Sequence, residues 1–337
     1  MGYLGALSVI VSLVAAAAHA GPRLESIKRR GFLACGVEPV VAGFADVDAQ
    51  GHYRGLDVDL CRALSAAIFG TPDNVKYVQA LTVGEFLRAA EIDVVSRRLT
   101  WELRREASLG LLFGPVTFYD GQGFLVSKQL SRANIRQLSG VEMCVAGGTV
   151  FESNVGSYFD AHALALKKHV LESGSTFDEI ANALTTGRCR IYTADVSELG
   201  AIRSKLPDSG AFDILSEQIS REPLAPMVRQ DDAQFFTLLR WTVFALINAE
   251  ELGVTSKNVD EMRKSTSADV QRLLGVVPGN GKALGLSETW AYNMIKALGN
   301  YGEIFERNLG RDSPIKLDRG LNRLSTAGGL MYAPPLR

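Results

Sequence analysis

The chain divides at Pro115-Val-Thr-Phe-Tyr-Asp-Gly-Gln-Gly-Phe124, an extended segment that contains two glycines. Such a segment suits a strand that bends while it crosses from one region of a protein to another. A second extended segment, Glu222-Pro-Leu-Ala-Pro226, suits a strand that crosses back. Together they predict an α/β fold of two lobes that are joined by two crossover strands.

Before the first crossover, short apolar strands alternate with helical patterns, which predicts mainly parallel sheets. We expect strands at 32–37, 76–78 and 92–95, and a helix that ends at Gly70. The segment 96–105 is irregular and rich in arginine, so it is a candidate binding loop. The buried face of the helix is predicted to carry Leu60, Cys61, Leu64, Ala67 and Ile68.

Between the crossovers the same alternation continues. A strand at 141–146 is followed by a tight turn, Gly147-Gly148-Thr149, and a helix from Phe151. Thr176-Phe-Asp-Glu179 has the capping-box spacing and begins a helix that ends at Gly187. A strand at 189–193 then leads to Asp195, which is placed to cap another helix.

After the second crossover, helical patterns dominate and predict a C-terminal helical extension that packs against the lobes. Helices are expected at 235–252 and 304–309. Between them, one buried stripe is predicted from Trp290, Met294, Ala297 and Leu298.

The N-terminal residues 1–20 contain no Asp, Glu, Lys or Arg and end in Ala18-His19-Ala20, the small-x-small pattern that signal peptidase accepts. We expect a signal peptide that is cleaved after Ala20. A retained membrane anchor is the alternative, because a leader normally begins with a positive residue. No later stretch has the roughly 20 apolar residues that a spanning helix needs.

Composition narrows the class of partner. The chain has 36 Lys plus Arg against 37 Asp plus Glu, with no long run of one sign, so nucleic acid is not expected to bind. A hydrophobic content of 47% is that of a globular chain, and 337 residues are enough for two domains. We expect a small-molecule ligand.

The four cysteines are Cys35, Cys61, Cys144 and Cys189. No C-x-x-C spacing is present and histidine is scarce, so no metal site is predicted. In an exported chain the simplest pairing is Cys35 with Cys61 and Cys144 with Cys189. The sequence allows three pairings, and four buried free thiols are the alternative.

Many collinear motifs resemble the periplasmic solute-binding proteins of family 3, above all the general L-amino-acid-binding proteins that serve ABC importers. This resemblance implies a two-lobe type II binding-protein fold that closes on an amino acid, needs no cofactor and delivers its ligand to a permease in the inner membrane. It also implies a periplasmic monomer. The expected boundaries are 21–119 for the first part of lobe 1, 120–222 for lobe 2, and 223–337 for the return to lobe 1 with the extension. The motifs are Gly55-Leu-Asp-Val-Asp-Leu-Cys61, Glu91-Ile-Asp-Val-Val-Ser-Arg97, Arg105, the crossover at 115–124, Gly187-Arg-Cys189, Asp195, Glu222-Pro-Leu224 and Asn300-Tyr-Gly-Glu-Ile-Phe-Glu-Arg307.

The resemblance also implies which residues bind. Arg105 matches the family's carboxylate-binding arginine, and Thr100 on the same loop matches its partner hydroxyl. Thr149 and Val150 open a helix whose free N–H groups would complete the carboxylate site from the other lobe. Asp195 matches the residue that accepts the α-ammonium.

Three positions depart from the family's pattern. Arg98 stands where Asn is usual, and a second cation would favour an acidic side chain or a dicarboxylate. Glu38 stands at a position that is Asn-like in the family. In the alternative, Glu38 pairs with Arg98 and cancels the effect of the second cation, so the direction of the specificity change stays open. Val150 replaces a Thr and removes a hydroxyl but keeps the backbone N–H.

Two other functions are weighed against amino-acid binding. The first is a periplasmic enzyme on the same fold, similar to cyclohexadienyl or arogenate dehydratases, for which Glu38 is the candidate acid. The second is a receptor subunit that signals without transport, or a binder of organic acids without an amino group. We expect no catalytic residues, because the chain lacks the G-x-S-x-G, P-loop and H-E-x-x-H patterns.

Overall fold

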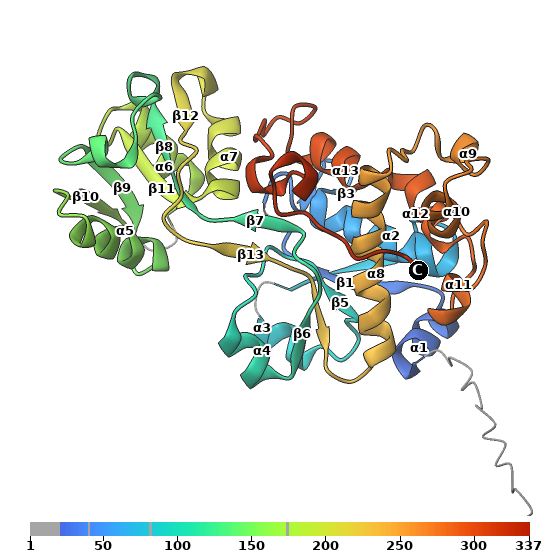
Figure 1. Cartoon of the computed structure of the whole chain (residues 1–337). Helices are drawn as coiled ribbons and strands as arrows, with labels where there is room; N and C mark the ends of the chain where they lie inside the picture. The colour runs from blue at the N-terminus through green and yellow to red at the C-terminus, as the bar shows by residue number, and fades with distance from the viewer. Residues whose placement is uncertain (1–20, 40, 81–82, 173–174) are drawn as a thin grey trace, which may run out of the picture.

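The computed structural model describes residues 21–39, 41–80, 83–172 and 175–337. The predicted signal peptide, residues 1–20, lies outside the described residues. Figure 1 shows two lobes connected by two extended strands, β7 (Phe118–Asp120) and β13 (Glu222–Leu224), which pair antiparallel. The two-lobe α/β fold with two crossover strands, predicted from the sequence, is confirmed.

The first lobe is built on a five-stranded sheet with the order β4-β1-β5-β14-β6. Strand β1 pairs parallel with β4 and β5, whereas β14 runs antiparallel to both β5 and β6. The prediction of mainly parallel sheets is therefore correct for only part of this sheet. Strand β14 runs in the opposite direction because the chain returns to the first lobe through the second crossover and enters the sheet from its other end. The strands are β1 (Leu33–Val37), β4 (Val75–Gln79), β5 (Val94–Val95), β6 (Leu111–Phe113) and β14 (Met227–Arg229), with a hairpin of β2 (Asp46–Val47) and β3 (Tyr53–Arg54) beside them.

The second lobe repeats this design with the order β10-β9-β11-β8-β12. Strand β9 pairs parallel with β10 and β11, and β8 runs antiparallel to β11 and β12. The strands are β8 (Gln122–Ser127), β9 (Glu142–Ala146), β10 (Lys167–Leu171), β11 (Ile191–Asp195) and β12 (Phe212–Ile214), and the helices are α5 (Val150–Ala161), α6 (Phe177–Thr185) and α7 (Val196–Lys205).

Local signals placed several helix ends correctly. Helix α2 (Leu56–Phe69) ends at Gly70, whose φ of 79° is in the left-handed region. Helix α6 begins with the predicted capping box, in which the Thr176 and Glu179 side chains bond each other's backbone. The remaining helices of the first lobe are α1 (Pro22–Arg30), α3 (Val83–Arg88) and α4 (Leu103–Leu109).

Each lobe contains one disulfide. Cys35 on β1 is bonded to Cys61 on α2, and Cys144 on β9 is bonded to Cys189 just before β11. All four cysteines are buried. The structure selects this pairing among the three that the sequence allowed, and each bond joins elements of a single lobe.

The C-terminal extension is helical, as predicted. In the stripe on α12, Ala297 is exposed rather than buried, and Ala291 and Ile295 complete the buried face. No helix within the described ranges is both long enough and apolar enough to span a membrane. The helices are α8 (Ala233–Glu251), α9 (Val259–Met262), α10 (Ala268–Leu273), α11 (Asn280–Ala283), α12 (Trp290–Leu298) and α13 (Tyr301–Asn308).

After α13 the C-terminal segment, residues 309–337, lies beside the crossover strand β7 and next to α7 of the second lobe (Figure 1). Arg203 on α7 donates to the backbone oxygens of Ile315 and Lys316 at 2.9 and 3.0 Å. A Cβ added at Gly200 of α7 would lie 2.9 Å from side-chain atoms of Ile315 and Leu317. The segment thus packs against both lobes.

Candidate functional site

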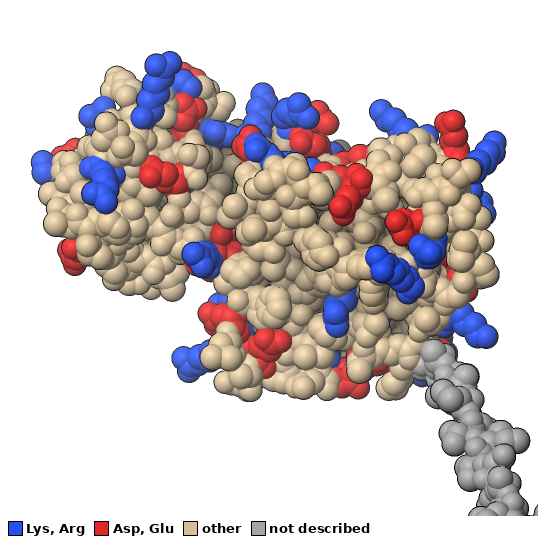
Figure 2. Space-filling view, in the orientation of Figure 1, with Lys and Arg blue, Asp and Glu red and all other residues tan. Residues whose placement is uncertain are grey.

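Three of the predicted binding residues lie where the crossover strands meet the lobes. The loop between β5 and α4 carries Arg98 and Thr100, and Asp195 lies at the end of β11. Basic and acidic side chains elsewhere are interspersed on the face shown in Figure 2, without a large patch of one sign. This junction is therefore the candidate site.

Asp195 occupies the N-cap position of α7, as predicted, but its side chain makes no capping bond. Its Oδ1 atom is buried and has no hydrogen-bond partner in the described part of the chain. Burial and the charges of Asp120, Glu222 and Glu198 raise the pKa of this carboxyl to about 8. Asp195 thus presents an unsatisfied acceptor, which a cation would stabilise.

Asp120, at the end of β7, is a site residue that the sequence reasoning missed. Its Oδ1 atom accepts from the backbone N–H groups of Gly121 and Ser197 at 2.9 and 3.2 Å. Its Oδ2 atom is buried without a partner among the described residues, and burial raises the pKa of the carboxyl to about 6. The signal available in the sequence was an acid beside glycine in the crossover segment.

Arg98 reaches from the first lobe to the second. Its Nη1 atom donates to Oγ of Ser197 on α7 at 3.3 Å, and its guanidinium lies 5.7 Å from the centre of the Phe44 ring. Glu38 forms its ion pair with the adjacent Arg97, at 3.2 Å. The direct pairing of Glu38 with Arg98, which the alternative in the sequence analysis required, is therefore not present.

Thr100 and Arg105 form a second group on the first lobe. Oγ1 of Thr100 donates to Oε2 of Glu222 on β13 at 2.8 Å, and Nη1 of Arg105 donates to the backbone oxygen of Thr100 at 2.7 Å. Arg105 also pairs with Glu102 at 3.1 Å, and its side chain is 31% exposed. Arg105 lies on helix α4 and not on an irregular loop, because a helix begins at Leu103.

The second lobe contributes the N-terminus of α5. Gly148, just before this helix, has a φ of 68°, a left-handed conformation that suits glycine in a tight turn. Thr149 is the N-cap residue, but its hydroxyl donates to the backbone oxygen of Ala146 at 2.7 Å. Val150 as a whole residue is 63% exposed. First-turn N–H groups of a helix lack intrahelical acceptors and favour an anion.

The structure thus brings Arg98 and Asp195 together, because Arg98 bonds Ser197 two residues beyond Asp195. It links Thr100 to Arg105 through the backbone. Thr149 and Val150 lie at the start of α5 on the other lobe. Binding by all of these residues at once therefore requires the lobes to approach each other.

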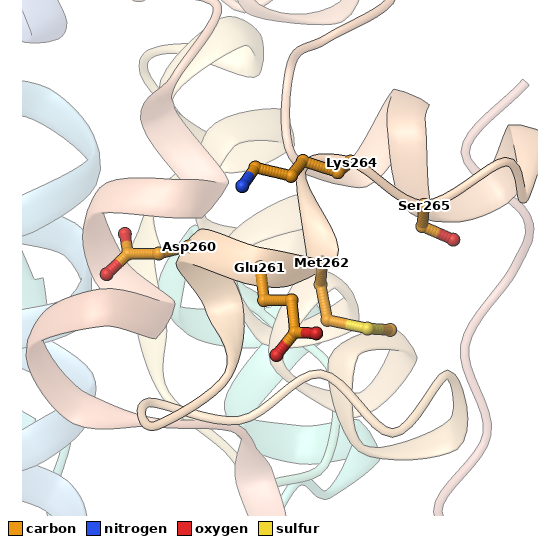
Figure 3. Close-up of a pocket in the computed structure, with 5 residues that line it drawn as sticks. All are labelled: Asp260, Glu261, Met262, Lys264 and Ser265. Atoms are coloured by element: carbon orange, nitrogen blue, oxygen red, sulfur yellow. The ribbon is translucent and has the colours of Figure 1, made fainter.

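A surface hollow on the C-terminal extension is a weaker candidate for a binding site than the crossover junction. Figure 3 shows that its lining residues diverge, with Asp260 and Glu261 pointing in different directions. Asp260 is already bonded to Tyr292 and Lys296. Within the described ranges, no group of three or more acidic, histidine or cysteine side chains is arranged to hold a metal ion.

Sequence comparisons reveal relatives of nearly full length. The chain is 46% identical to the general L-amino acid-binding periplasmic protein AapJ of Rhizobium johnstonii, over 98% of both chains. It is 43% identical to the putative amino-acid ABC transporter-binding protein YhdW of Escherichia coli, over 99% of this chain and 98% of the relative. It is 41% identical to the glutamate/glutamine/aspartate/asparagine-binding protein BztA of Rhodobacter capsulatus, over 98% of both chains.

A solved structure agrees with these relatives. The chain is similar to an ABC transporter periplasmic binding protein from Brucella ovis with glutathione bound, at 44% identity and a TM-score of 0.80, covering 93% of this chain and 99% of that one. No protein-family model matches. The relatives, the two-lobe fold and the residues at the crossover junction lead to one conclusion: the chain belongs to the amino-acid-binding periplasmic proteins of ABC transporters, the solute-binding proteins of family 3.

Proposed function

We propose that this protein captures L-amino acids in the periplasm and delivers them to an inner-membrane ABC permease, as a monomer that closes its lobes around the ligand. The observation that carries the proposal is the unpartnered, buried Oδ1 of Asp195 at the junction of the lobes. An α-ammonium group would supply both the hydrogen bond and the positive charge that this carboxylate lacks.

The α-carboxylate would bind Arg105 and Thr100 of the first lobe and the N–H groups at Thr149 and Val150 of the second. Arg105 must then exchange Glu102 for the ligand, which is feasible because its pair is partly exposed. Since the recognising groups come from both lobes, only a closed state satisfies the whole zwitterion. The ligand therefore shifts the population towards closure.

The two crossover strands are the natural axis of this motion. We assign residues 21–119 and 223–337 to one moving body and residues 120–222 to the other. Exchanging the pair of strands β7 and β13 for a rigid connection would abolish closure. Cleavage after Ala20 would release the protein into the periplasm.

The relatives' names favour a ligand with a polar or acidic side chain. BztA is named for glutamate, glutamine, aspartate and asparagine. The Brucella ovis protein holds glutathione, whose γ-glutamyl residue carries a free α-ammonium and α-carboxylate. AapJ is named as a general L-amino-acid binder, so the common element is the α-amino-acid group itself.

The dehydratase alternative has little support. Its candidate acid, Glu38, is held in an ion pair with Arg97 at 3.2 Å. The full-length relatives are named as binding proteins of transporters and not as enzymes. An ancestral precursor of cyclohexadienyl dehydratase shares the fold at 22% identity and a TM-score of 0.51, which carries no assignment of activity.

The test is a thermal-shift screen of the purified protein against the twenty L-amino acids and common dicarboxylates, because a ligand that binds only the folded state raises Tm. At least one L-amino acid should raise Tm, and Asp195→Asn should abolish that shift. Asp178→Asn is a matched control, since Asp178 is exposed in the first turn of α6 on the same lobe. No shift with any amino acid would refute the proposal.

A further inference from the structure

The backbone of Arg98 is held in a conformation that glycine prefers. Its φ is 46°, in the left-handed region that few side chains adopt. Asp57, at the start of α2, accepts through Oδ1 from Oγ of Ser96, two residues before Arg98, at 2.6 Å. The loop is therefore fixed before the arginine at Ser96 and after it at Leu99, whose backbone oxygen accepts from the N–H of Ala225 at 3.1 Å, and the guanidinium is directed towards the second lobe.

The guanidinium then lies within electrostatic range of carboxyl groups from three parts of the chain, although it forms no direct ion pair with any carboxylate that the structure describes. Its charge acts on Asp57 of the first lobe, Asp120 of the crossover, and Asp195 and Glu198 of the second lobe. Asp57 and Asp120 are buried, each with 3% of its surface exposed. In each of them the Oδ2 atom has no hydrogen-bond partner among the described residues. The neighbouring cation, Arg97, is already paired with Glu38.

The site therefore contains more carboxyl groups than cationic groups. One guanidinium acts on four carboxyls: burial raises the pKa of each of them, and the positive charge of Arg98 lowers it. The α-ammonium of an amino acid would satisfy Asp195 alone. Near the remaining carboxyls Arg98 already supplies a positive charge, which favours their ionised forms, so a group of the protein itself does what a cationic ligand side chain would otherwise do.

We propose that Arg98 is a specificity-determining residue that acts as a built-in counter-ion and excludes basic amino acids, so that removing its charge opens the site to ligands with a cationic side chain. The proposal rests on the proposed function, since it presupposes an amino-acid site at Asp195. The reason is the position of Arg98 between the lobes. A ligand with a lysine or arginine side chain would place a second positive charge beside the Arg98 guanidinium, and the two like charges would repel each other.

Two substitutions test this proposal. Arg98→Gly suits the positive φ and so favours folding, and Arg98→Gln keeps most of the side-chain length without its charge. The measurement is isothermal titration calorimetry with L-arginine, L-lysine and L-glutamine, and the readout is the ratio of affinities for L-arginine and L-glutamine. Both variants should raise this ratio at least about tenfold over the wild-type protein.

The matched control is Lys316→Gly, which also exchanges a cation at a positive φ, 52°, for glycine, but at an exposed position of the C-terminal segment. It should leave the affinity ratio unchanged. If both Arg98 variants bind amino acids with the wild-type ratio, the inference is wrong and the proposed function stands. If the wild-type protein and both variants bind no amino acid at all, the proposed function fails and the inference fails with it.

Discussion

The side chain of Asn322 bonds both backbone groups of Tyr119, accepting from its N–H at 2.6 Å and donating to its carbonyl at 3.1 Å. Asn322 belongs to the C-terminal segment and Tyr119 to the crossover strand β7, 203 positions apart in sequence. The carboxamide thereby occupies hydrogen bonds that a neighbouring strand would otherwise make. The C-terminal segment is thus part of the structure that supports the crossover.

Asn322→Ala should lower the free energy of unfolding by about 1–3 kcal/mol, because it leaves two backbone groups of a half-buried strand unpaired. Urea unfolding monitored by circular dichroism measures this change. Asn182→Ala is the control, since Asn182 is exposed on α6, and should change stability by less than about 0.5 kcal/mol. Equal stability of the two variants would contradict a structural role for Asn322.

The ion pair of Arg319 with Glu250 is the second contact that anchors this segment. Both side chains are mostly buried, at 15% and 16% exposed, and the guanidinium also lies 5.4 Å from the ring centres of Tyr301 and Phe305. Arg319→Ala should cost about 2–4 kcal/mol, because it leaves the Glu250 carboxylate buried without its partner. Arg323→Ala, which removes a largely exposed pair with Asp318, should cost under about 1 kcal/mol in the same unfolding measurement.

Arg105 is expected to contribute to binding rather than to folding. Arg105→Ala should weaken amino-acid affinity by about 10- to 100-fold, because a charge-assisted pair of hydrogen bonds to the α-carboxylate is lost. Titration calorimetry measures the affinity, and thermal unfolding of the ligand-free protein should show little change, since the Arg105 pair with Glu102 is partly exposed. The neighbouring Arg104→Ala, at an exposed position, should keep the wild-type affinity.

The raised pKa of Asp195 predicts a pH-dependent affinity. With a pKa of about 8 in the ligand-free protein, Asp195 is mostly protonated at pH 7, whereas an α-ammonium requires the carboxylate. Binding should therefore release a proton, and the affinity should fall towards tenfold per pH unit as the pH drops below 8. Calorimetry at one pH in buffers with different ionisation enthalpies would detect the proton, and identical heats would contradict the prediction.

The raised pKa of Asp195 also makes the stability of the ligand-free protein depend on pH. The stability should fall as the pH rises, whereas the affinity should increase. Because folding raises the pKa of Asp195 from its ordinary value of 3.8, the protonated carboxyl stabilises the fold fully below about pH 4. This contribution is lost as the pH rises towards 8. Unfolding of the ligand-free protein across this range should show a larger loss for the wild type than for Asp195→Asn, and parallel curves would argue against burial of the charge.

The sequence by itself determined the features that depend on near neighbours. The glycine end of α2 at Gly70, the capping box at Thr176 and Glu179, and the N-cap position of Asp195 were all predicted, because each involves residues a few positions apart. The bend of the crossover segment was predicted in the same way, from glycines that lie within that segment. The resemblance to a family then supplied Arg105 and Thr100 as candidates, which local patterns alone would have left as surface residues.

Only the tertiary structure decided which distant charges meet. Glu38 pairs with Arg97 and not Arg98, and Asp57, Asp120 and Glu198 join Asp195 around Arg98, although they come from separate elements. These outcomes depend on side-chain direction and on the path by which two lobes meet at the crossover strands. Burial, which sets the pKa values of the site, is likewise created only when the lobes and the crossover pack together.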